Sequence, residues 1–364
     1  MLTRPIEVDS HKPIPGPLSA TDLSQMMADY IDSGNAHLLD QLREDMLRSG
    51  LNLDLWAASQ MKYYHSIEQH IVVLRQFIRY YTCVGIPKEL IHHYIKRGSS
   101  SYQPSFDKVH PSLPVIRPLP SMRGRNRWPS THTIAMVWQS VVAFAQDLRS
   151  LGLLYREFLD YWDRYQPSTT MEHWSTSDKG LPGNIRFQYP PVMKPDAVHF
   201  HVFITAFARL NGTDAVMQVM SDMHARNIRP DAHNWTVLTG VYTGVDITSA
   251  EKILSRMESA LPKDAKPAAL STRKDTNRTF TGPLPRPANW IPGPTLVTYT
   301  TILRGLIDQG KLEEARQFEG RMIDAGYVAG SDERTERVLE LLRERETTHR
   351  IPWRQRASWR PGKN

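Results

Sequence analysis

Two proline-containing segments set 35 residues apart constrain the fold of this chain more than any other feature of its sequence. Lys194-Pro195-Asp196 precedes the segment 197–231, and Arg229-Pro230-Asp231 ends it. Between them, apolar residues recur at spacings of three and four in two runs, which Asn211-Gly212 separates. This spacing puts apolar side chains on one face of a helix, and glycine and proline end helices. The segment therefore predicts two short antiparallel helices.

The same pattern recurs along the chain. Segment 296–330 aligns with 197–231 without gaps, and 232–261 is a third copy with a turn that is one residue shorter. Segments 20–54 and 55–89 are weaker copies, which depend on spacing. One helix pair cannot bury both of its faces, so a core forms only when neighbouring pairs stack. The apolar positions that 296–330 and 197–231 share include Tyr299 with Phe200, Ile302 with Phe203, Leu306 with Phe207 and Met322 with Met223.

The sequence VTYTTILRGLIDQGKLEEA, residues 297–315, resembles the consensus of the pentatricopeptide repeat (PPR) family. The resemblance implies an all-α fold, a right-handed superhelical solenoid of antiparallel helix-turn-helix repeats with irregular insertions. Two alternatives remain open, a generic helical hairpin and the tetratricopeptide repeat with its 34-residue period.

Composition divides the chain into repeats and irregular stretches. Gly98 is expected to stop a helix that begins at Leu90, and Gly152 is expected to break the helix pair near 131–166. The arginines of the linker 98–129 are consistent with either RNA contact or a solvated basic loop. The basic and aromatic tail, 347–364, is consistent with binding either to RNA or to another protein. We predict a flexible leader (1–19), divergent repeats (20–97), a disordered basic, proline-rich linker (98–129), a degenerate helix pair (130–166), an irregular linker (167–193), the main array (194–330, with repeats 197–231, 232–261 and 296–330 and a loop insertion, 262–294), a capping helix (331–346) and a basic aromatic tail (347–364).

Charge and cysteine content narrow the classes of partner and site. The net charge of +7 and the pI near 9.4 favour an anionic partner. Cys83 is the only cysteine, which excludes an internal disulfide and a thiolate zinc cluster. No run of 18 apolar residues is present, so no membrane span is expected. The first residues do not form a targeting peptide, and a mitochondrial location is therefore implied by the family resemblance alone.

Enzyme chemistry finds little support in the sequence. A zinc deaminase needs Cys-x-x-Cys, which one cysteine excludes, and no β-rich stretch suggests a nuclease domain. His92-His93 and the pair His199 and His201 do not share a helix face, so we expect no metal and no cofactor. The chain is predicted not to be an enzyme.

The resemblance also implies which residues would contact RNA. In PPR proteins one repeat recognises one base of single-stranded RNA with two or three side chains. The family places them at the fifth and last positions of each repeat, and apolar second-position residues sandwich the base. On this chain the fifth and last positions are His201 with Asp231, Thr300 with Gly330, Ser24 with Asp54, and Ser59 with Glu89. Thr236 is a fifth position without a partner, because the insertion removes the last residue of its repeat. The second positions are Val198, His233 and Val297.

These residues only partly follow the family pattern. Ser24 with Asp54 conforms, but His201 is an unusual fifth residue and Gly330 has no side chain. The resemblance implies single-stranded RNA as a partner, in organellar RNA processing, stability or translation, with no DNA and no membrane expected. The departures from the pattern favour either weak RNA contact or use of the array as a scaffold. The competing hypothesis is a non-catalytic scaffold for ribosomal or RNA-processing proteins, for example a subunit associated with the mitochondrial ribosome.

Overall fold

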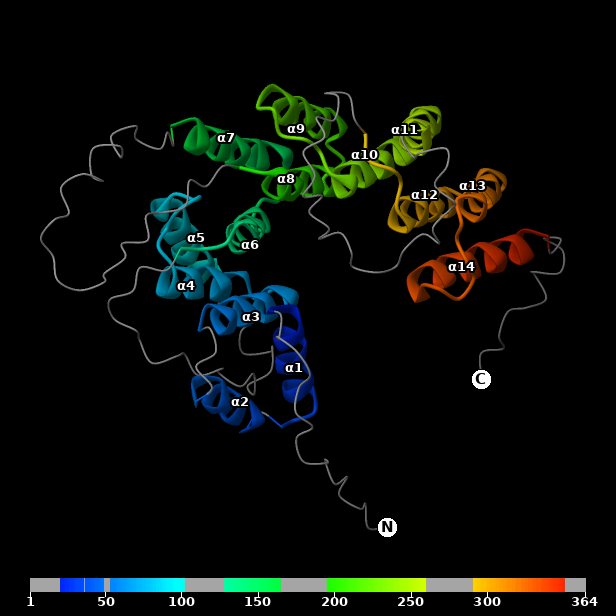
Figure 1. Cartoon of the computed structure of the whole chain (residues 1–364). Helices are drawn as coiled ribbons and strands as arrows, with labels where there is room; N and C mark the ends of the chain where they lie inside the picture. Colours follow the sequence, from blue (N-terminus) through cyan, green and yellow to red (C-terminus); the bar gives the residue numbers. More distant parts are fainter. Residues whose placement is uncertain are drawn as a thin grey trace, which may run out of the picture. The chain divides into compact units, whose positions relative to one another are not determined.

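The computed structural model describes residues 20–35, 37–48, 53–101, 128–164, 195–259 and 291–350. Within these ranges the regular elements are fourteen α-helices and no strands, which confirms the all-α prediction (Figure 1). Contacts divide the chain into two compact units, Met1–Pro195 and Asp196–Asn364. Among the described helices, none has both the length and the apolar character that a membrane span requires.

Unit 1 is built from seven of the described helices. Helix α1 packs on α3, α3 packs on α4, and α4 contacts both α5 and α6. A turn at Gly34 separates α1 from α2, and this glycine has a φ of +75°. The helices are α1 (Ala20–Asp32), α2 (His37–Arg48), α3 (Leu53–Ser66), α4 (His70–Tyr80), α5 (Lys88–Ser101), α6 (Thr131–Val142) and α7 (Leu148–Arg164).

Gly85 ties the connection between α4 and α5 to the last two helices of unit 1. Its carbonyl accepts a hydrogen bond from Trp138 Nε1 of α6, and its N–H donates to the hydroxyl of Tyr161 of α7, both at 2.9 Å. Its φ is +84°, and an added Cβ would lie 2.7 Å from Ile134 Cδ1. Only glycine fits both the backbone and the space.

Two predicted helix breaks are wrong. Gly98 lies inside α5. Because it has no side chain, α5 approaches α4 so closely that a Cβ at this position would lie 2.1 Å from Ile71 Cδ1. Gly152 lies inside α7, where a single glycine costs only about 1 kcal/mol. The break between α6 and α7 falls before Gly152. Asp147 precedes α7, and its carboxylate accepts the N–H of Ser150 at 2.7 Å, which caps the start of the helix.

Unit 2 is a stack of helix pairs. Its first helices pack in a row, α8 on α10, α10 on α12 and α12 on α14, and each second helix packs on its own first helix. Residues 260–290 fall between α11 and α12, yet α10 and α12 remain in contact. The helices are α8 (Ala197–Arg209), α9 (Thr213–Ala225), α10 (Ala232–Val245), α11 (Ile247–Ser259), α12 (Leu296–Asp308), α13 (Leu312–Asp324) and α14 (Glu333–Arg350).

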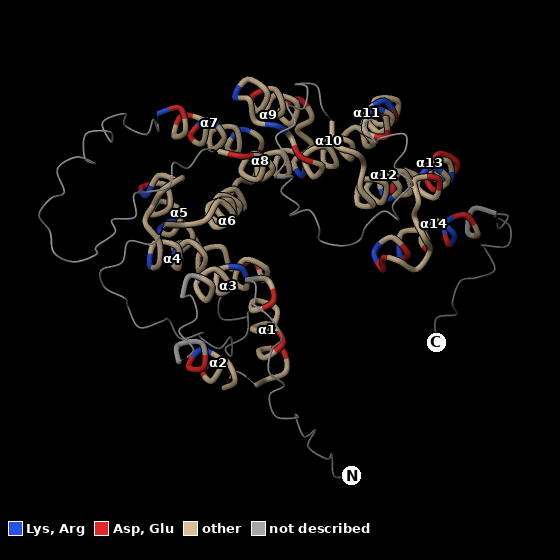
Figure 2. Tube along the Cα trace, viewed as in Figure 1, with Lys and Arg blue, Asp and Glu red and all other residues tan. Residues whose placement is uncertain are grey.

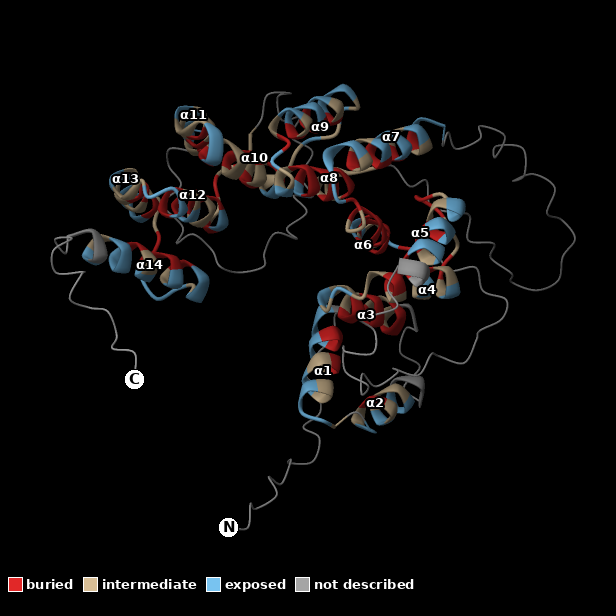
Figure 3. Cartoon of the chain, turned by 180° about the vertical axis from the view of Figure 1, so that it is seen from behind, coloured by how far each residue is buried: buried red, intermediate tan, exposed pale blue. Residues whose placement is uncertain are grey.

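The core of unit 2 follows the predicted apolar stripes. Phe200, Phe203 and Tyr299 are fully buried, as are Val219 and Met322 on the second helices. Figure 3 shows buried residues along α8, α10 and α12 and many exposed ones on α9 and α11. Helix α14 covers most of the segment predicted to cap the array. The predicted leader, the linkers beyond Ser101 and Arg164, the interior of the insertion and the tail beyond Arg350 lie outside the described residues.

Candidate nucleic-acid interface

Each first helix of unit 2 begins at a side-chain cap. Asp231 Oδ1 accepts the N–H of Asn234 at 2.9 Å, and Asp332 Oδ2 accepts the N–H of Thr335 at 2.9 Å. Asp196 and Thr295 cap α8 and α12 in the same way. Such caps contribute about 1 kcal/mol each and fix where the helix starts. Positions in the first helices can therefore be counted from the residue after the cap.

A polar side chain occupies the third position of all four first helices. These are His199, Asn234, Thr298 and Thr335, none more than 1% exposed. Buried polar groups need hydrogen-bond partners, and three of these four find theirs on the preceding first helix. The sequence carries this signal, polar residues at one position of an apolar stripe, but our sequence prediction did not use it.

The partners are the fifth-position residues. His201 Nδ1 lies 2.9 Å from Asn234 Oδ1, the hydroxyls of Thr236 and Thr298 are 2.8 Å apart, and those of Thr300 and Thr335 are 3.0 Å apart. We call these three pairs the polar seam. It joins α8 to α10, α10 to α12 and α12 to α14 with the same contact at each step.

The seam limits what the fifth-position residues can offer a ligand. Thr236 is 7% exposed and also donates to the carbonyl of Ala232 at 2.8 Å. Thr300 is half-buried and is bonded to the carbonyl of Leu296. Both of the predicted base-contacting hydroxyls in unit 2 are therefore already used within the protein.

His201 differs because it has a second ring nitrogen. The Asn234 amide oxygen can only accept, so Nδ1 carries the hydrogen and Nε2 is the acceptor. The Thr205 hydroxyl lies 3.3 Å from Nε2. Burial lowers the pKa of His201, and nearby His233 adds to this, although Asn234 and Asp231 oppose it. The ring is therefore neutral at physiological pH.

His233 and Asp231 lie beside this ring at the start of α10. The His233 ring meets that of His201 edge to face, with ring centroids 6.0 Å apart, and its Nδ1 lies 4.0 Å from Asp231 Oδ2. The His233 side chain is 58% exposed, and that of Asp231 is 41% exposed. The structure thus brings the predicted residues His201, Asp231 and His233 together.

The second positions form an exposed row next to the seam. Val198 is half-buried, while His233, Val297 and Arg334 are exposed. Val297 is notable because it is apolar and 58% exposed. Helices α8, α10 and α12 carry few charges along their length (Figure 2). We call Val198, His233, Val297 and Arg334 the second-position row.

The predicted residues of unit 1 do not lie on a surface of this kind. Ser24 is 8% exposed, and Ser59 is fully buried with its hydroxyl bonded to the Leu55 carbonyl at 2.6 Å. Asp54 lies within the first turn of α3, whereas Asp231 precedes α10. The 35-residue count places the start of α3 too late, because this helix begins at Leu53.

A smaller register difference occurs at the end of the array. The count of 35 pairs Gly330 with Thr300, but Gly330 lies in the loop after α13 and its N–H donates to Glu336. Asp332 takes the place that Asp231 has at α10. The loop is two residues longer than the repeat length predicts. The described residues contain no group of three or more His, Cys, Asp or Glu side chains that could hold a metal.

Comparison with known proteins identifies one repeat directly. Residues 297–327 match the family model of the PPR repeat. No curated protein sequence matches the chain.

Among solved structures, the chain is similar to PPR10 in complex with an 18-nt psaJ RNA element (TM-score 0.40, 13% identity), covering 91% of this chain and 39% of that one. A variant of PPR10 with the same element gives the same values. PPR10 from maize gives a TM-score of 0.19 at 14% identity, covering 95% of this chain and 55% of that one. The chain spans about two fifths of the length of the two RNA-bound structures.

Proposed function

This chain is a helical-repeat protein that carries a pentatricopeptide repeat, and on this premise we propose that it binds single-stranded RNA without catalysing a reaction. The observation that carries the proposal is the second-position row. It places four side chains at equivalent sites on four stacked helices, beside the seam. PPR repeats bind one base per repeat from such positions.

The residues of the row suit the parts of a nucleotide. Val198 and Val297 offer apolar contact to base faces, and His233 offers an aromatic ring. Stacking of a base on a side chain contributes about 1–3 kcal/mol. Nε2 of His201 can accept a hydrogen bond from a base edge in place of the Thr205 hydroxyl, which lies 3.3 Å away. Arg334 suits a phosphate.

Base selectivity is expected to concentrate at the step between α8 and α10. Thr236 and Thr300 are committed to the seam, while His201 and Asp231 retain acceptor atoms. A few such contacts give moderate affinity, supplemented by phosphate contacts that the net charge of +7 favours.

The biological setting that we propose follows from the family resemblance. We infer a role in organellar RNA metabolism, in the processing, stability or translation of mitochondrial transcripts. Fractionation of cells that express the tagged protein tests the location: enrichment with the mitochondrial matrix supports it, and exclusion from mitochondria contradicts it.

One observation favours a second function, a scaffold that holds proteins. The fifth-position hydroxyls of Thr236 and Thr300 are bonded within the stack rather than left for a ligand. On this alternative, ribosomal or RNA-processing proteins occupy the face of the first helices. Crosslinking in cells, with bound RNA and bound proteins identified from one sample, separates the two functions.

A direct test replaces exposed residues so that folding is spared. The variant His233→Glu/Val297→Glu should bind a fluorescent 20-nucleotide RNA at least about 10-fold more weakly, because two stacking contacts are lost and two negative charges are added. The matched control is Ile323→Glu/Val328→Glu, since Ile323 and Val328 are 55% and 60% exposed and lie on α13 and in the loop after it. Equal affinity of both variants would contradict RNA binding by this face.

A further inference from the structure

Helices α4 and α5 of unit 1 carry a surface of nearly one charge sign. Arg75 and Arg79 are exposed on α4, and Lys88, Lys96 and Arg97 are exposed on α5. The sequences of these two helices contain a single carboxylate, Glu89. We call the five cationic residues the α4–α5 basic surface, and Figure 2 shows its blue segments on both helices.

Several other helices of the chain mix both charge signs, whereas α1 and α9 carry carboxylates and no Lys or Arg. Helix α7 alternates Arg156 and Arg164 with Glu157, Asp160 and Asp163. Helices α13 and α14 mix acidic and basic residues throughout, with ion pairs such as Arg316 with Glu346. Helices α4 and α5 differ from both kinds, because their charged residues are nearly all positive.

Helix stability does not account for Lys88, although it does favour Arg79 in the last turn of α4. Lys88 is the first residue of α5, where the helix dipole favours an anion and disfavours a cation. Clustered like charges also repel one another in the folded state. A cost of this kind is understandable when the surface meets an anion.

The packing of α5 fixes the surface in place. Ile91, Tyr94 and Gly98 are buried, and the close approach of Gly98 to Ile71 holds α5 against α4. The exposed residues of α5 recur at spacings of four, Lys88 with Lys96 through His92, and Glu89 with Arg97 through His93. They form one stripe along the helix.

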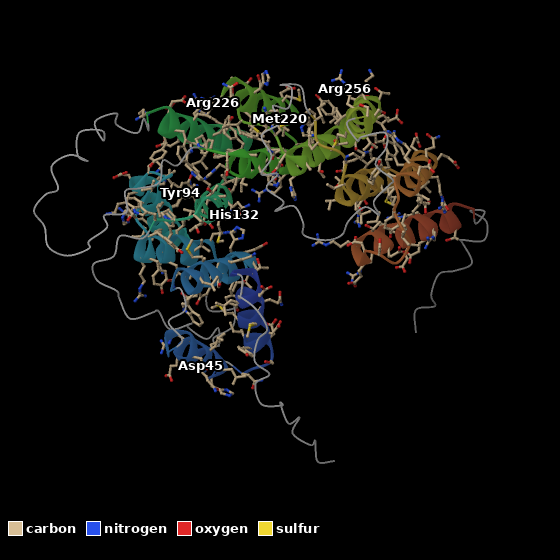
Figure 4. All side chains as sticks on the ribbon, viewed as in Figure 1. Asp45, Tyr94, His132, Met220, Arg226 and Arg256 are labelled. Carbon is tan, nitrogen blue, oxygen red and sulfur yellow. The ribbon has the colours of Figure 1, made fainter. Side chains whose placement is uncertain are left out.

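Aromatic rings support this stripe from below. The exposed ring of His93 meets Tyr94 edge to face, with centroids 5.3 Å apart. Tyr94, labelled in Figure 4, stacks on Phe144 at 5.4 Å, and Phe144 meets His70 at 6.2 Å. His92 thus places an exposed imidazole ring between Lys88 and Lys96, and His93 places another between Glu89 and Arg97. Cations with interleaved rings are the composition of surfaces that bind single-stranded nucleic acid.

We infer that the α4–α5 basic surface binds the phosphate backbone of single-stranded RNA, in addition to the face formed by α8, α10, α12 and α14. This inference rests on the proposed function, because it assigns a second contact to the same ligand. The contact is independent of base sequence, since ammonium and guanidinium groups pair with phosphate. The exposed imidazole rings favour RNA over an acidic protein or an anionic membrane, because bases stack on such rings.

The test compares two triple variants with the same change in net charge. Lys88→Gln/Lys96→Gln/Arg97→Gln removes cations from the surface, and Arg149→Gln/Lys252→Gln/Arg256→Gln removes exposed cations from α7 and α11 (Arg256 is labelled in Figure 4). Each full-length protein is titrated with fluorescein-labelled U20 at several KCl concentrations. The slope of log K against log salt should become shallower by about two for the first variant, at roughly 0.7 per lost phosphate contact. It should stay unchanged for the control.

Charge-conserving substitution guards against misfolding. Lys88→Arg/Lys96→Arg/Arg97→Lys should keep the wild-type slope. Equal slopes of the two triple variants would overturn the inference. Vesicles of 70% phosphatidylcholine and 30% phosphatidylserine give a second outcome that would overturn it. This outcome is that Lys88→Gln/Lys96→Gln/Arg97→Gln weakens binding to the vesicles but leaves RNA binding unchanged.

The same titration separates the two proposals. If wild-type protein does not bind U20, the proposed function and this inference both fall. If His233→Glu/Val297→Glu weakens binding while the α5 variant behaves as its control, only this inference falls. If the α5 variant flattens the slope while His233→Glu/Val297→Glu has no effect, the basic surface stands and the face of the first helices is excluded.

Discussion

At the scale of single residues, the polar seam decides which side chains stack the repeats and which face outward. A third-position residue donates its backbone N–H to the cap at the start of its own helix. Its side chain meets the fifth-position side chain of the first helix before it. This arrangement repeats at three successive steps with different chemistry, an imidazole with an amide and then two pairs of hydroxyls. The contact between successive first helices can therefore be made by different residue types, provided that a donor faces an acceptor.

The seam should appear as an energetic coupling between Thr236 and Thr298. Each change to valine removes the hydrogen bond between the two hydroxyls and should cost about 1–2 kcal/mol of unfolding free energy. The double variant should cost less than the sum by about 0.5–1.5 kcal/mol, because the shared hydrogen bond can be lost only once. Urea denaturation measures all four proteins.

Thr301→Val is the control for this cycle, since the Thr301 hydroxyl bonds only to the Val297 carbonyl of its own helix among the contacts described. It should change stability by less than about 0.5 kcal/mol. Strict additivity of Thr236→Val and Thr298→Val would show that the seam does not couple the repeats.

His201 should make stability depend on pH. Burial lowers its pKa in the folded protein below the usual value near 6.5. The unfolded chain therefore binds the proton more readily, so stability is complete above about pH 6.5 and declines as the pH falls. Urea midpoints between pH 7.5 and 5 should fall less steeply for His201→Asn than for the wild type. Parallel pH dependences would argue against a neutral, buried ring.

Residue positions were predictable where the helix start was marked. Asp231 and Pro230 mark the start of α10, and His201, His233 and Asp231 come together as the repeat count implies. No such mark precedes α3, so the count misplaces Asp54, and Ser59 turns into the core. The seam could not be found from period alone, because it depends on which polar residue faces which neighbour.

At the scale of helices, glycine has two opposite roles that sequence alone does not separate. Gly98 and Gly152 were both predicted to interrupt helices, and both lie inside one. Gly98 stands where two helices almost touch. Gly152 has no heavy atom within 4 Å of the place where a Cβ would be. Only the neighbouring helix distinguishes the two cases.

Alanine at these two glycines should therefore change stability in opposite directions. Gly152→Ala should raise the unfolding free energy by about 0.5–1 kcal/mol through helix propensity. Gly98→Ala should lower it by about 1–3 kcal/mol, because the new methyl group forces Ile71 to move. Thermal melts of the two variants beside the wild type give the comparison. A stabilised Gly98→Ala protein would mean that α4 and α5 are less closely packed than described.

At the scale of the whole chain, two units are joined by a segment outside the described residues. In repeat arrays each pair of helices contacts only its neighbours, so a unit with its own core does not require distant parts of the chain. The row of stacked first helices and the core around Tyr299 and Phe318 lie wholly within unit 2.

Residues 196–364 expressed alone should therefore fold. Circular dichroism should show helix, and urea should give a cooperative transition, since the buried residues of this unit are shared among its own helices. The midpoint should match one of the transitions of the full chain. A broad, non-cooperative loss of helix would mean that unit 1 is needed for the stability of unit 2.

The fold class could be predicted from the sequence because the 35-residue spacing and the helix-ending residues recur. Each repeat therefore checks the assignment of the others. The all-α architecture of stacked pairs followed from the segment 197–231 alone. Segments without a copy gave no such check. The pair α6 and α7 was therefore divided at the wrong place, at Gly152 rather than at Asp147.

The seam has a consequence for anyone who would redesign what this array recognises. A protein engineer who changes Thr236 to alter a preferred base also removes the partner of Thr298 on the next helix. Recoding one unit therefore demands a compensating edit in the unit that follows, and the edits spread along the array. The smallest exchangeable module is not one repeat but the joint between two.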